Sequence, residues 1–414
     1  MILAVLTNSY PFGNEEPFLE EEIRTCERLY DEIHIYSLAP LSAQLTRYVP
    51  QNAKVIMIRK KMGCFSKLRA IMKLLCPSTI NEILFVRHAF RYTFKDAISK
   101  LFYNYFRFDK YIVDCLMNED VNNTIFYSYW LSHLAFGLYK YKLKNGNAFC
   151  ISRAHRFDNF IDFKASLFRR EILTNLNYVY PISHEGIVEI ENRIFPYIDK
   201  NYNKLSLHHI GVDLPNFRNP DNASNIIKIV SCSFVWKIKR LDILINALEQ
   251  IQDVNISWTH FGGGKDFEEI QRLASEKLGT KYNISYQLMG QTDHDEILRF
   301  YRDNHVDIFI NCSDHEGIPV SIMEAMATGI ICIARDVGGN KELVVNLHNG
   351  ILLSADAGGN EFAKAILSYI EFEEQKLIEM RDCAREKIID EFSSPLVFEQ
   401  FHLENIHKFS ENLS

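Results

Sequence analysis

The chain has 414 residues, of which 47% are apolar and 24% charged, and its nine cysteines form no C-x-x-C pair. This composition predicts a globular protein of two domains in a reducing cytoplasm. It argues against a thiolate zinc site, and no apolar run approaches the ~18 residues of a membrane span. The net charge of −7 and the lack of a recognition motif argue against a nucleic-acid partner.

The first 40 residues predict a strand at ILAVL, a helix at FLEEEIRTCERLY and a second strand at EIHIYSL. This strand–helix–strand order is the one that a parallel sheet requires. The leading MILAVLTNSYPF has no basic leader, so we expect a first strand and not a signal peptide. Further strands are expected at TIFYSY, AFCISRAH and YVYPIS, with helices between them.

Residues 59–110 are strongly basic in an otherwise acidic chain. Twelve Lys or Arg stand there against Glu82, Asp96 and Asp109, and FSKLRAIMKLL, FVRHAFRYTF and KLFYNYFRF add many apolar and aromatic residues. The segment is either a site for an anionic membrane surface or a set of helices whose basic outer faces are solvated.

Periodicity disappears in GVDLPNFRNPDNASN, residues 211–225, which we interpret as a linker. Strands and helices then alternate strictly from IIKIVSCSF to IICIARD, as in doubly wound parallel sheets. We therefore expect two Rossmann-like α/β domains facing across a cleft, residues 1–210 on the acceptor side and 226–395 on the donor side. Residues 396–414 would form a C-terminal helix that crosses back to the first domain. Ligands in such sheets bind beyond the carboxyl ends of the strands.

The stretch DHEGIPVSIMEAMATG, residues 314–329, puts Glu316 in a strand-to-helix loop and Glu324 inside the next helix. Pro319 is expected as the first helical residue and Gly329 as a left-handed cap. Free N–H groups at the helix start would bind phosphate, with Glu324 placed for two ribose hydroxyls and Glu316 beyond the phosphates. Taken alone, the same spacing also fits a surface helix that follows a solvated turn.

The pattern S-x-x-EGIPVSIMEAMATG, followed by A-x-DVGG-x-x-E, resembles the signature of the family 4 retaining glycosyltransferases, which have the two-domain GT-B fold. SCSFVWKIKRLDILINAL resembles the segment in which a basic residue of these enzymes grips the donor diphosphate. FGGGKDFEEIQRLA and LMGQTDHDEILRFYRDNHVDIFINCS resemble the next two strand-and-helix units. Earlier segments, among them SYPFGNEEPFLEEEI and SRAHRFDNF, resemble members that build bacterial surface polysaccharides.

The resemblance implies a role for three charged residues and one loop. Lys239 matches the lysine that offsets charge on the departing diphosphate, Glu324 matches the ribose-binding glutamate, and Glu316 matches the glutamate that touches the transferred sugar. Backbone groups of the loop would help to hold sugar and phosphate: Gly317, Ile318, Pro319 and Val320.

Phe234 departs from the family pattern, because many members have an arginine there. One cation is therefore missing, and whether Arg240 or Lys237 replaces it stays open. Gly263 follows a strand and either brings backbone close to a nucleotide or forms a plain turn. His155 matches a histidine near the hydroxyls of the transferred sugar, with a packed core histidine as the alternative.

The turn after the first strand lies on the acceptor side of such folds, and we expect acceptor contacts from Gly13, Asn14 and Glu16. The resemblance implies retaining transfer from a UDP- or GDP-sugar to a glycan or lipid-linked hydroxyl in cell-surface polysaccharide synthesis, with no cofactor and no metal. A non-catalytic nucleotide-sugar-binding protein and a nucleotide-sugar epimerase on the same fold are the alternatives. We expect a cytoplasmic location, peripheral on the inner face of the plasma membrane if residues 59–110 dock on lipid.

Overall fold

The structure, a computed structural model, describes residues 1–13, 16–40, 42–58, 64–90, 92–159, 167–198, 202–221 and 224–413. The chain divides into two compact units. The first consists of Met1–Gly211 together with Pro395–Ser414, and the second of Val212–Ser394. Asn14 lies outside the described residues, as do Arg59, Lys60, Lys61 and Arg91 of the basic segment.

The first unit contains a six-stranded parallel sheet in the order β3-β2-β1-β4-β5-β6. Its strands are short and nearly all buried, as expected where helices cover both faces of a parallel sheet. They are β1 (Ile2–Thr7), β2 (Glu32–Ser37), β3 (Ala53–Met57), β4 (Thr124–Ser128), β5 (Phe149–Ala154) and β6 (Tyr178–Pro181). The sequence analysis anticipated each of these except β3, whose AKVIM has a lysine within a short apolar run.

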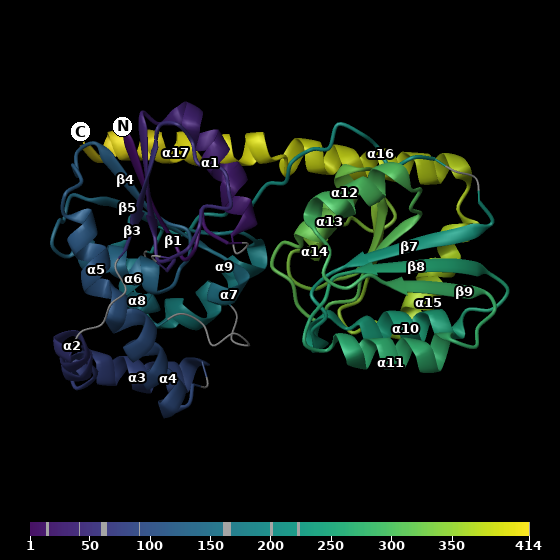
Figure 1. The fold of residues 1–414 in the computed structure, drawn as a ribbon, viewed down its shortest axis with the longest axis horizontal. Helices are drawn as coiled ribbons and strands as arrows, with labels where there is room; N and C mark the ends of the chain where they lie inside the picture. Colours follow the sequence, from purple (N-terminus) through teal and green to yellow (C-terminus); the bar gives the residue numbers. More distant parts are fainter. Residues whose placement is uncertain are drawn as a thin grey trace. The chain divides into compact units, whose positions relative to one another are not determined.

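The helices of the first unit fall into those that cover the sheet and a group at one end of the unit. Figure 1 shows α2, α3 and α4 together, away from the strands. The helical segments are α1 (Pro17–Leu29), α2 (Cys64–Leu74), α3 (Pro77–Phe90), α4 (Phe94–Lys100), η1 (Leu101–Tyr105), α5 (Phe106–Leu116), α6 (His133–Lys142), α7 (Arg156–Asn159), α8 (Arg169–Asn175), α9 (His184–Ile194), η3 (Phe195–Tyr197) and α17 (Ser394–Leu413).

The second unit repeats this architecture with the sheet order β12-β11-β10-β7-β8-β9, again all parallel. The strands are β7 (Ile226–Cys232), β8 (Asn255–Phe261), β9 (Ile284–Leu288), β10 (Ile308–Asn311), β11 (Ile331–Arg335) and β12 (Gly350–Leu353). Sequence reasoning stopped at β11 and did not include β12. Counted from its own first strand, each sheet has the order 3-2-1-4-5-6 of doubly wound folds.

Helices cover both faces of the second sheet. Figure 1 shows α10, α11 and α15 on one side of its strands and α12, α13 and α16 on the other. The helical segments are η4 (Lys237–Lys239), α10 (Leu241–Gln250), α11 (Phe267–Leu278), α12 (His294–Asp303), α13 (Val320–Ala327), α14 (Asn340–Leu343), α15 (Gly359–Glu371) and α16 (Glu374–Glu391).

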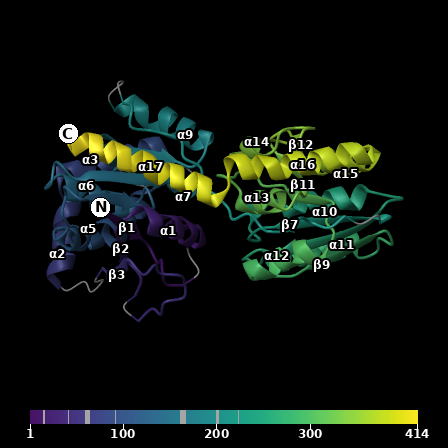
Figure 2. The ribbon, with the colours of Figure 1, turned by 90° about the horizontal axis from the view of Figure 1, so that it is seen from above.

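Helix α17 completes the first unit although the second unit precedes it in the chain; Figures 1 and 2 show it beside α1. Its His402 is fully buried and contacts three residues of that region, Glu22 at 3.1 Å, Cys26 at 3.1 Å and the Tyr30 hydroxyl at 2.9 Å. Farther along α17, Asn405 accepts a hydrogen bond from the Tyr180 hydroxyl at 2.7 Å. A buried polar network therefore adds to the apolar packing of this helix on the sheet.

Candidate active site

The strand order of the second unit places two loops side by side at the edge where ligands of doubly wound sheets bind. Strands β7 and β10 are neighbours, yet their connections run in opposite directions, so this is the switch point of the sheet. The loop after β7 contains Phe234 and Lys239, and the loop after β10 contains Glu316. Topology alone thus brings Lys239 and Glu316 together.

Glu316 is held by three donors that all reach the same carboxylate oxygen. Oε1 accepts hydrogen bonds from the Lys239 ammonium at 2.6 Å, the Ser313 hydroxyl at 2.6 Å and the Asn311 amide at 3.0 Å. Burial by itself would raise the pKa of Glu316, but the Lys239 charge and the three hydrogen bonds lower it below its ordinary value. The buried carboxylate is therefore ionised, and Oε2 has no hydrogen-bond donor among the described residues.

Two glycines make the backbone around Glu316 possible. Gly338 has φ 57, and a Cβ there would lie 2.0 Å from the carbonyl oxygen of Glu316. A Cβ on Gly339 would lie 2.3 Å from the carbonyl oxygen of Gly317, which accepts a hydrogen bond from the Gly339 N–H. The backbone of the DVGG segment thus packs closely against the loop. A larger residue at Gly338 would displace Glu316, and one at Gly339 would displace Gly317.

Helix α13 starts one residue later than the sequence predicted. Pro319 has φ −79 but an extended ψ of 106, so it caps the helix, and Val320 is the first helical residue. The N–H groups of Val320 and Ser321 have no acceptor among the described residues, which leaves the positive end of α13 open beside Glu316. Gly329 ends the helix at φ 83, which confirms the predicted left-handed cap.

Glu324 projects from within α13, with 15% of its side chain exposed. Its Oε1 lies 2.8 Å from Nε2 of His294, the first residue of α12, and this contact raises the pKa of His294. Sequence reasoning missed His294, because nothing in its local pattern shows which element will face α13. The other oxygen of Glu324 has no partner among the described residues.

The two basic residues of the loop after β7 differ in their surroundings. Lys239 is about one-fifth exposed and has Glu316 as its ion-pair partner. Arg240 adopts φ 50 ahead of α10, and its guanidinium binds both Asp242 at 2.9 Å and Asp314 at 3.0 Å. Asp314 also pairs with Arg335 at 2.6 Å. The Arg240 charge is thus already shared by two carboxylates, and its role toward a donor stays a prediction.

The glycine run after β8 packs against the same loop. A Cβ on Gly262 would lie 1.9 Å from the Ser233 carbonyl oxygen, and Gly263 accepts a hydrogen bond from the Val235 N–H at 2.9 Å. These glycines therefore let two loops approach closely, and the donor contact expected of Gly263 stays untested. Phe234 is 59% exposed and stacks on Trp236 with ring centroids 5.8 Å apart.

At the switch point of the first unit, the loops after β1 and β4 meet through Glu16. Its carboxylate accepts hydrogen bonds from the backbone N–H groups of three successive residues, Asn8, Ser9 and Tyr10, at 2.7–3.0 Å. The Trp130 indole donates a further one at 2.6 Å. Both oxygens of Glu16 are occupied, so this residue holds the loop. The acceptor contact predicted for it remains a prediction.

Gly13 and His155 lie near the same edge of the first sheet. Gly13 is exposed at φ 70, and its carbonyl oxygen accepts hydrogen bonds from Thr46 and Arg47. His155 is buried against the rings of Tyr129 and Trp130, whose centroids lie 4.7 and 4.6 Å away.

The ionisation of His155 follows from this burial. Desolvation, with a smaller effect of the Arg153 charge, lowers the pKa of His155 to about 3. The imidazole is therefore neutral near pH 7, and its Nε2 has no partner among the described residues. Asp158 fixes the backbone here, because one of its oxygens accepts the N–H groups of His155 and Leu131, each at 3.1 Å.

Asp293 and Asp295 have the D-x-D spacing of some metal sites, but they flank His294 at the start of α12. Within the part of the chain that the structure describes, no group of three His, Cys, Asp or Glu side chains could hold a metal ion. In that same part, no helix is both long enough and apolar enough to cross a membrane.

Part of the chain is similar to a known protein family. Residues 216–387 match the family Glycosyl transferases group 1. The amylovoran biosynthesis glycosyltransferase AmsK of Erwinia amylovora is 32% identical over 207 residues, which cover 48% of this chain and 49% of AmsK. The chain spans 36% and 28% of the length of two other relatives, so these alignments cover only part of each protein.

Solved structures extend the likeness over both units. The lipopolysaccharide outer core galactosyltransferase WaaB aligns with a TM-score of 0.68 at 17% identity, covering 99% of each chain. Anabaena Alr3699/HepE, solved in complex with UDP, aligns with a TM-score of 0.64 at 15% identity, covering 98% of this chain and 99% of that one. At such identities the likeness shows the fold, which is GT-B, as the sequence analysis predicted.

Proposed function

We propose that the protein transfers a sugar from a nucleotide diphosphate sugar to a hydroxyl group, with retention at the anomeric carbon. The match of residues 216–387 to the glycosyl transferases group 1 family supports this proposal. One observation carries this proposal. Glu316 and Lys239 form a 2.6 Å ion pair at the switch point of the donor-side sheet, beside the open start of α13. A cation, an ionised carboxylate and free N–H groups together suit a sugar attached to a diphosphate.

Lys239 and the N-terminus of α13 would stabilise the negative charge that grows on the diphosphate as the glycosidic bond breaks. Because Lys239 is held against Glu316, its ammonium is already ordered before the donor binds. The backbone from Gly317 to Val320 would position the phosphates. The Oε2 of Glu316, which has no donor among the described residues, would face the sugar, either as a hydrogen-bond acceptor or as a support for positive charge at the anomeric carbon.

Two further residues would bind substrate hydroxyls. Glu324 would accept hydrogen bonds from the two ribose hydroxyls, and His294 orients its carboxylate through Oε1. His155, neutral near pH 7, would exchange a hydrogen bond with a sugar hydroxyl through its unpaired Nε2. We assign no contact to Asn14, and the acceptor contacts of Gly13 and Glu16 rest on their place after β1.

We infer a UDP-sugar as the first donor to test, supported by the UDP complex of the similarly folded HepE. A GDP-sugar is the alternative. The acceptor we infer is a glycan or lipid-linked hydroxyl in cell-surface polysaccharide synthesis, supported by the likeness to the amylovoran enzyme. A lipid-linked acceptor would bring the protein to the inner face of the plasma membrane as a peripheral protein.

Phe234 favours one other candidate, a protein that binds nucleotide sugars without transferring them. Its exposed ring stands where the resemblance leads us to expect an arginine, and Arg240 is occupied by two carboxylates. Without a second cation for the diphosphate, the protein would still bind the nucleotide sugar but would not transfer the sugar. A nucleotide-sugar epimerase would instead consume the donor with no acceptor present.

The experiment is nucleotide release from UDP-, GDP-, ADP- and CMP-sugars, with and without a membrane extract as the source of acceptor. Slow release from one donor that the extract accelerates would support a transferase and identify its nucleotide. Donor binding without release under either condition would favour the binding protein, and Phe234→Arg would then be the variant to test for gained release. An isomerised sugar still attached to the nucleotide would favour the epimerase.

A further inference from the structure

Helix α2 presents an apolar stripe to solvent. Leu68, Ile71 and Met72 have the spacing i, i+3, i+4 of one helix face, and Leu75 continues this spacing in the turn just after the helix; they are 56%, 49%, 62% and 72% exposed. On the opposite side of the helix, Ala70 is fully buried in the core of the first unit. The stripe is therefore additional to the apolar side that stabilises the fold.

The next two helices continue this pattern. Ile80 and Leu84 are 45% and 53% exposed on α3, and Phe94 and Ile98 are 48% and 41% exposed on α4, each pair one helical turn apart. The inner side of α3 is buried through residues such as Val86. We call these eight residues, seven of them on α2, α3 and α4 and Leu75 in the turn after α2, the outer face. Soluble monomers rarely expose so many large apolar side chains on adjoining helices unless the surface binds something.

Positive charge lies on the same helices. Lys67, Arg87 and Lys95 are exposed, and the Arg87 guanidinium lies 3.8 Å from the ring centroid of Phe94 on the outer face. Neither Lys67 nor Lys95 has an ion-pair partner among the described residues. These cations are thus available to an anionic partner that also contacts the apolar side chains.

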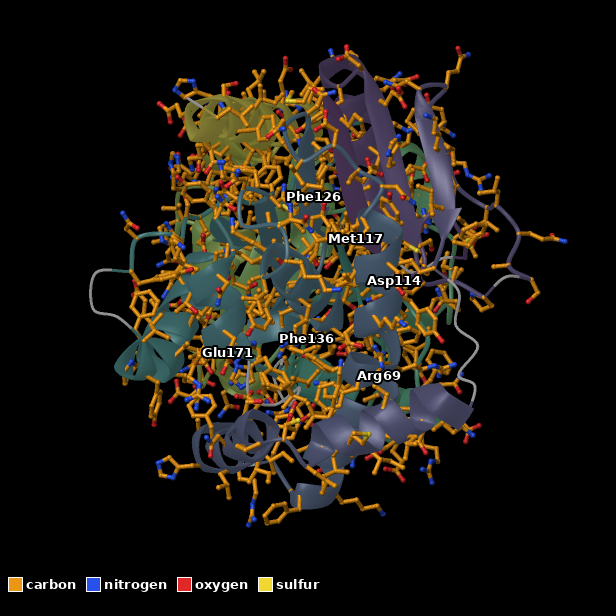
Figure 3. The ribbon with its side chains drawn as sticks, turned by 90° about the vertical axis from the view of Figure 1, so that its left-hand side faces the viewer. Arg69, Asp114, Met117, Phe126, Phe136 and Glu171 are labelled. Carbon is orange, nitrogen blue, oxygen red and sulfur yellow. The ribbon has the colours of Figure 1, made fainter. Side chains whose placement is uncertain are left out.

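The acidic residues of this region, Glu82, Asp96 and Asp109, make hydrogen bonds or ion pairs within the first unit. Glu82 is buried, accepts a hydrogen bond from the Phe168 N–H and pairs with Arg170. Asp109 is buried between Arg69 and Lys73; Figure 3 shows Arg69 between α2 and α5. Asp96 exchanges hydrogen bonds with Thr93 at the start of α4.

We propose that the outer face docks the protein on an anionic lipid bilayer, with its apolar side chains in the interface and Lys67, Arg87 and Lys95 against the lipid headgroups. Apolar residues flanked by Lys and Arg are the combination that binds such surfaces. A second copy of this chain fits less well, because a symmetric dimer through this face would bring like charges together. The proposal rests on the proposed function only in that a lipid-linked acceptor would lie at the same surface.

The test is co-sedimentation of the full chain with phosphatidylcholine vesicles that contain or lack phosphatidylglycerol, at low and high salt. We expect binding only with phosphatidylglycerol, and weaker binding at high salt. The double variant Met72→Ser/Leu75→Ser should bind about tenfold less tightly, because two exposed apolar side chains are lost from the interface. Lys67→Glu/Lys95→Glu should also bind the vesicles about tenfold less tightly, because its charge repels the anionic headgroups.

A matched control is Ile370→Ser/Ile378→Ser, which removes two side chains of 44% and 46% exposure from α15 and α16 of the second unit. It should bind vesicles as the unaltered chain does. Nucleotide release by Met72→Ser/Leu75→Ser without lipid reports on the proposed reaction separately, so failure of one proposal does not resemble failure of the other. Three results would overturn lipid docking: no phosphatidylglycerol-dependent binding, unchanged binding of the serine variant, or conversion of a dimer to a monomer by that variant with no vesicle binding by either form.

Discussion

The two switch points of this molecule use a buried glutamate in opposite ways. Glu16, in the first unit, receives donors on both carboxylate oxygens and holds the loop after β1 against Trp130. Glu316, in the second unit, receives three donors on one oxygen and none among the described residues on the other. The same strand order thus holds a glutamate with donors on both oxygens in one unit and a glutamate with donors on one oxygen in the other. A buried carboxylate oxygen without a donor among the described residues is the better guide to where substrate binds.

The largest effect should come from Lys239→Ala. The variant removes the ordered ammonium beside Glu316, and we expect turnover to fall by about 10²–10³ if charge develops on the diphosphate. The measurement is kcat for nucleotide release from the preferred donor. Lys364→Ala, which removes an exposed lysine from α15, serves as control and should keep full turnover. Unchanged turnover in Lys239→Ala would remove this residue from the reaction.

Glu16→Ala tests the other side of the comparison. Losing a charged acceptor of several buried donors should lower the free energy of unfolding by about 2–4 kcal/mol. Glu316→Gln should cost less than this, because an amide of the same shape keeps an acceptor for Ser313 and Asn311 and only the charge opposite Lys239 is lost. Urea titration of both variants measures these values. A larger loss of stability in Glu316→Gln than in Glu16→Ala would reverse the assignment of the two roles.

Glu324→Ala should weaken donor binding with a smaller change in turnover. The lost hydrogen bonds to a charged group are worth about 1.5–3 kcal/mol, which corresponds to a factor of about ten to a hundred in Kd. Titration with the nucleoside diphosphate measures it directly. His294→Ala sharpens the result, since it removes only the partner of Oε1 and should cost less. Equal Kd values for the Glu324→Ala variant and the unaltered chain would exclude ribose recognition by this residue.

The smallest effect concerns pH. The folded chain lowers the pKa of His155 from 6.5 to about 3, so as pH falls below 6.5 the unfolded chain takes up a proton that the folded chain does not. Stability is lost over that window, by up to about 2 kcal/mol between pH 7 and pH 5 for this one group. His155→Gln should lack that part of the acid sensitivity in urea titrations at both pH values. An identical pH dependence in the variant would mean that folding does not lower the pKa of His155.

Sequence patterns located the elements well and the partners of the site poorly. Alternating strand and helix signals indicated the doubly wound units, and Gly329 could be placed because a left-handed cap has a local signature. The strand β3 was missed because five residues with a lysine inside carry too little pattern. Pro319 was misplaced by one position, because its φ suits both the cap and the first helical residue.

The contacts that define the site come from elements far apart in the sequence. The family resemblance indicated Lys239 and Glu316 separately but not their ion pair, and nothing local indicated His294 as the partner of Glu324. The two carboxylates around Arg240 and the donors on both oxygens of Glu16 were likewise not predicted. Such partners depend on which loops the sheet order makes neighbours.

The placement of α17 has a consequence for how the protein is made. Residues 212–394 leave the ribosome before residues 395–413, so the second unit can fold while the first still lacks the helix that supplies His402 and Asn405. Until then the polar groups of Glu22, Tyr30 and Tyr180 face an incomplete core. Synthesis order and folding order are therefore inverted, because the unit that begins the chain is the last to be finished. Released chains that end at residue 394 should show a protease-resistant second unit and a protease-sensitive first one.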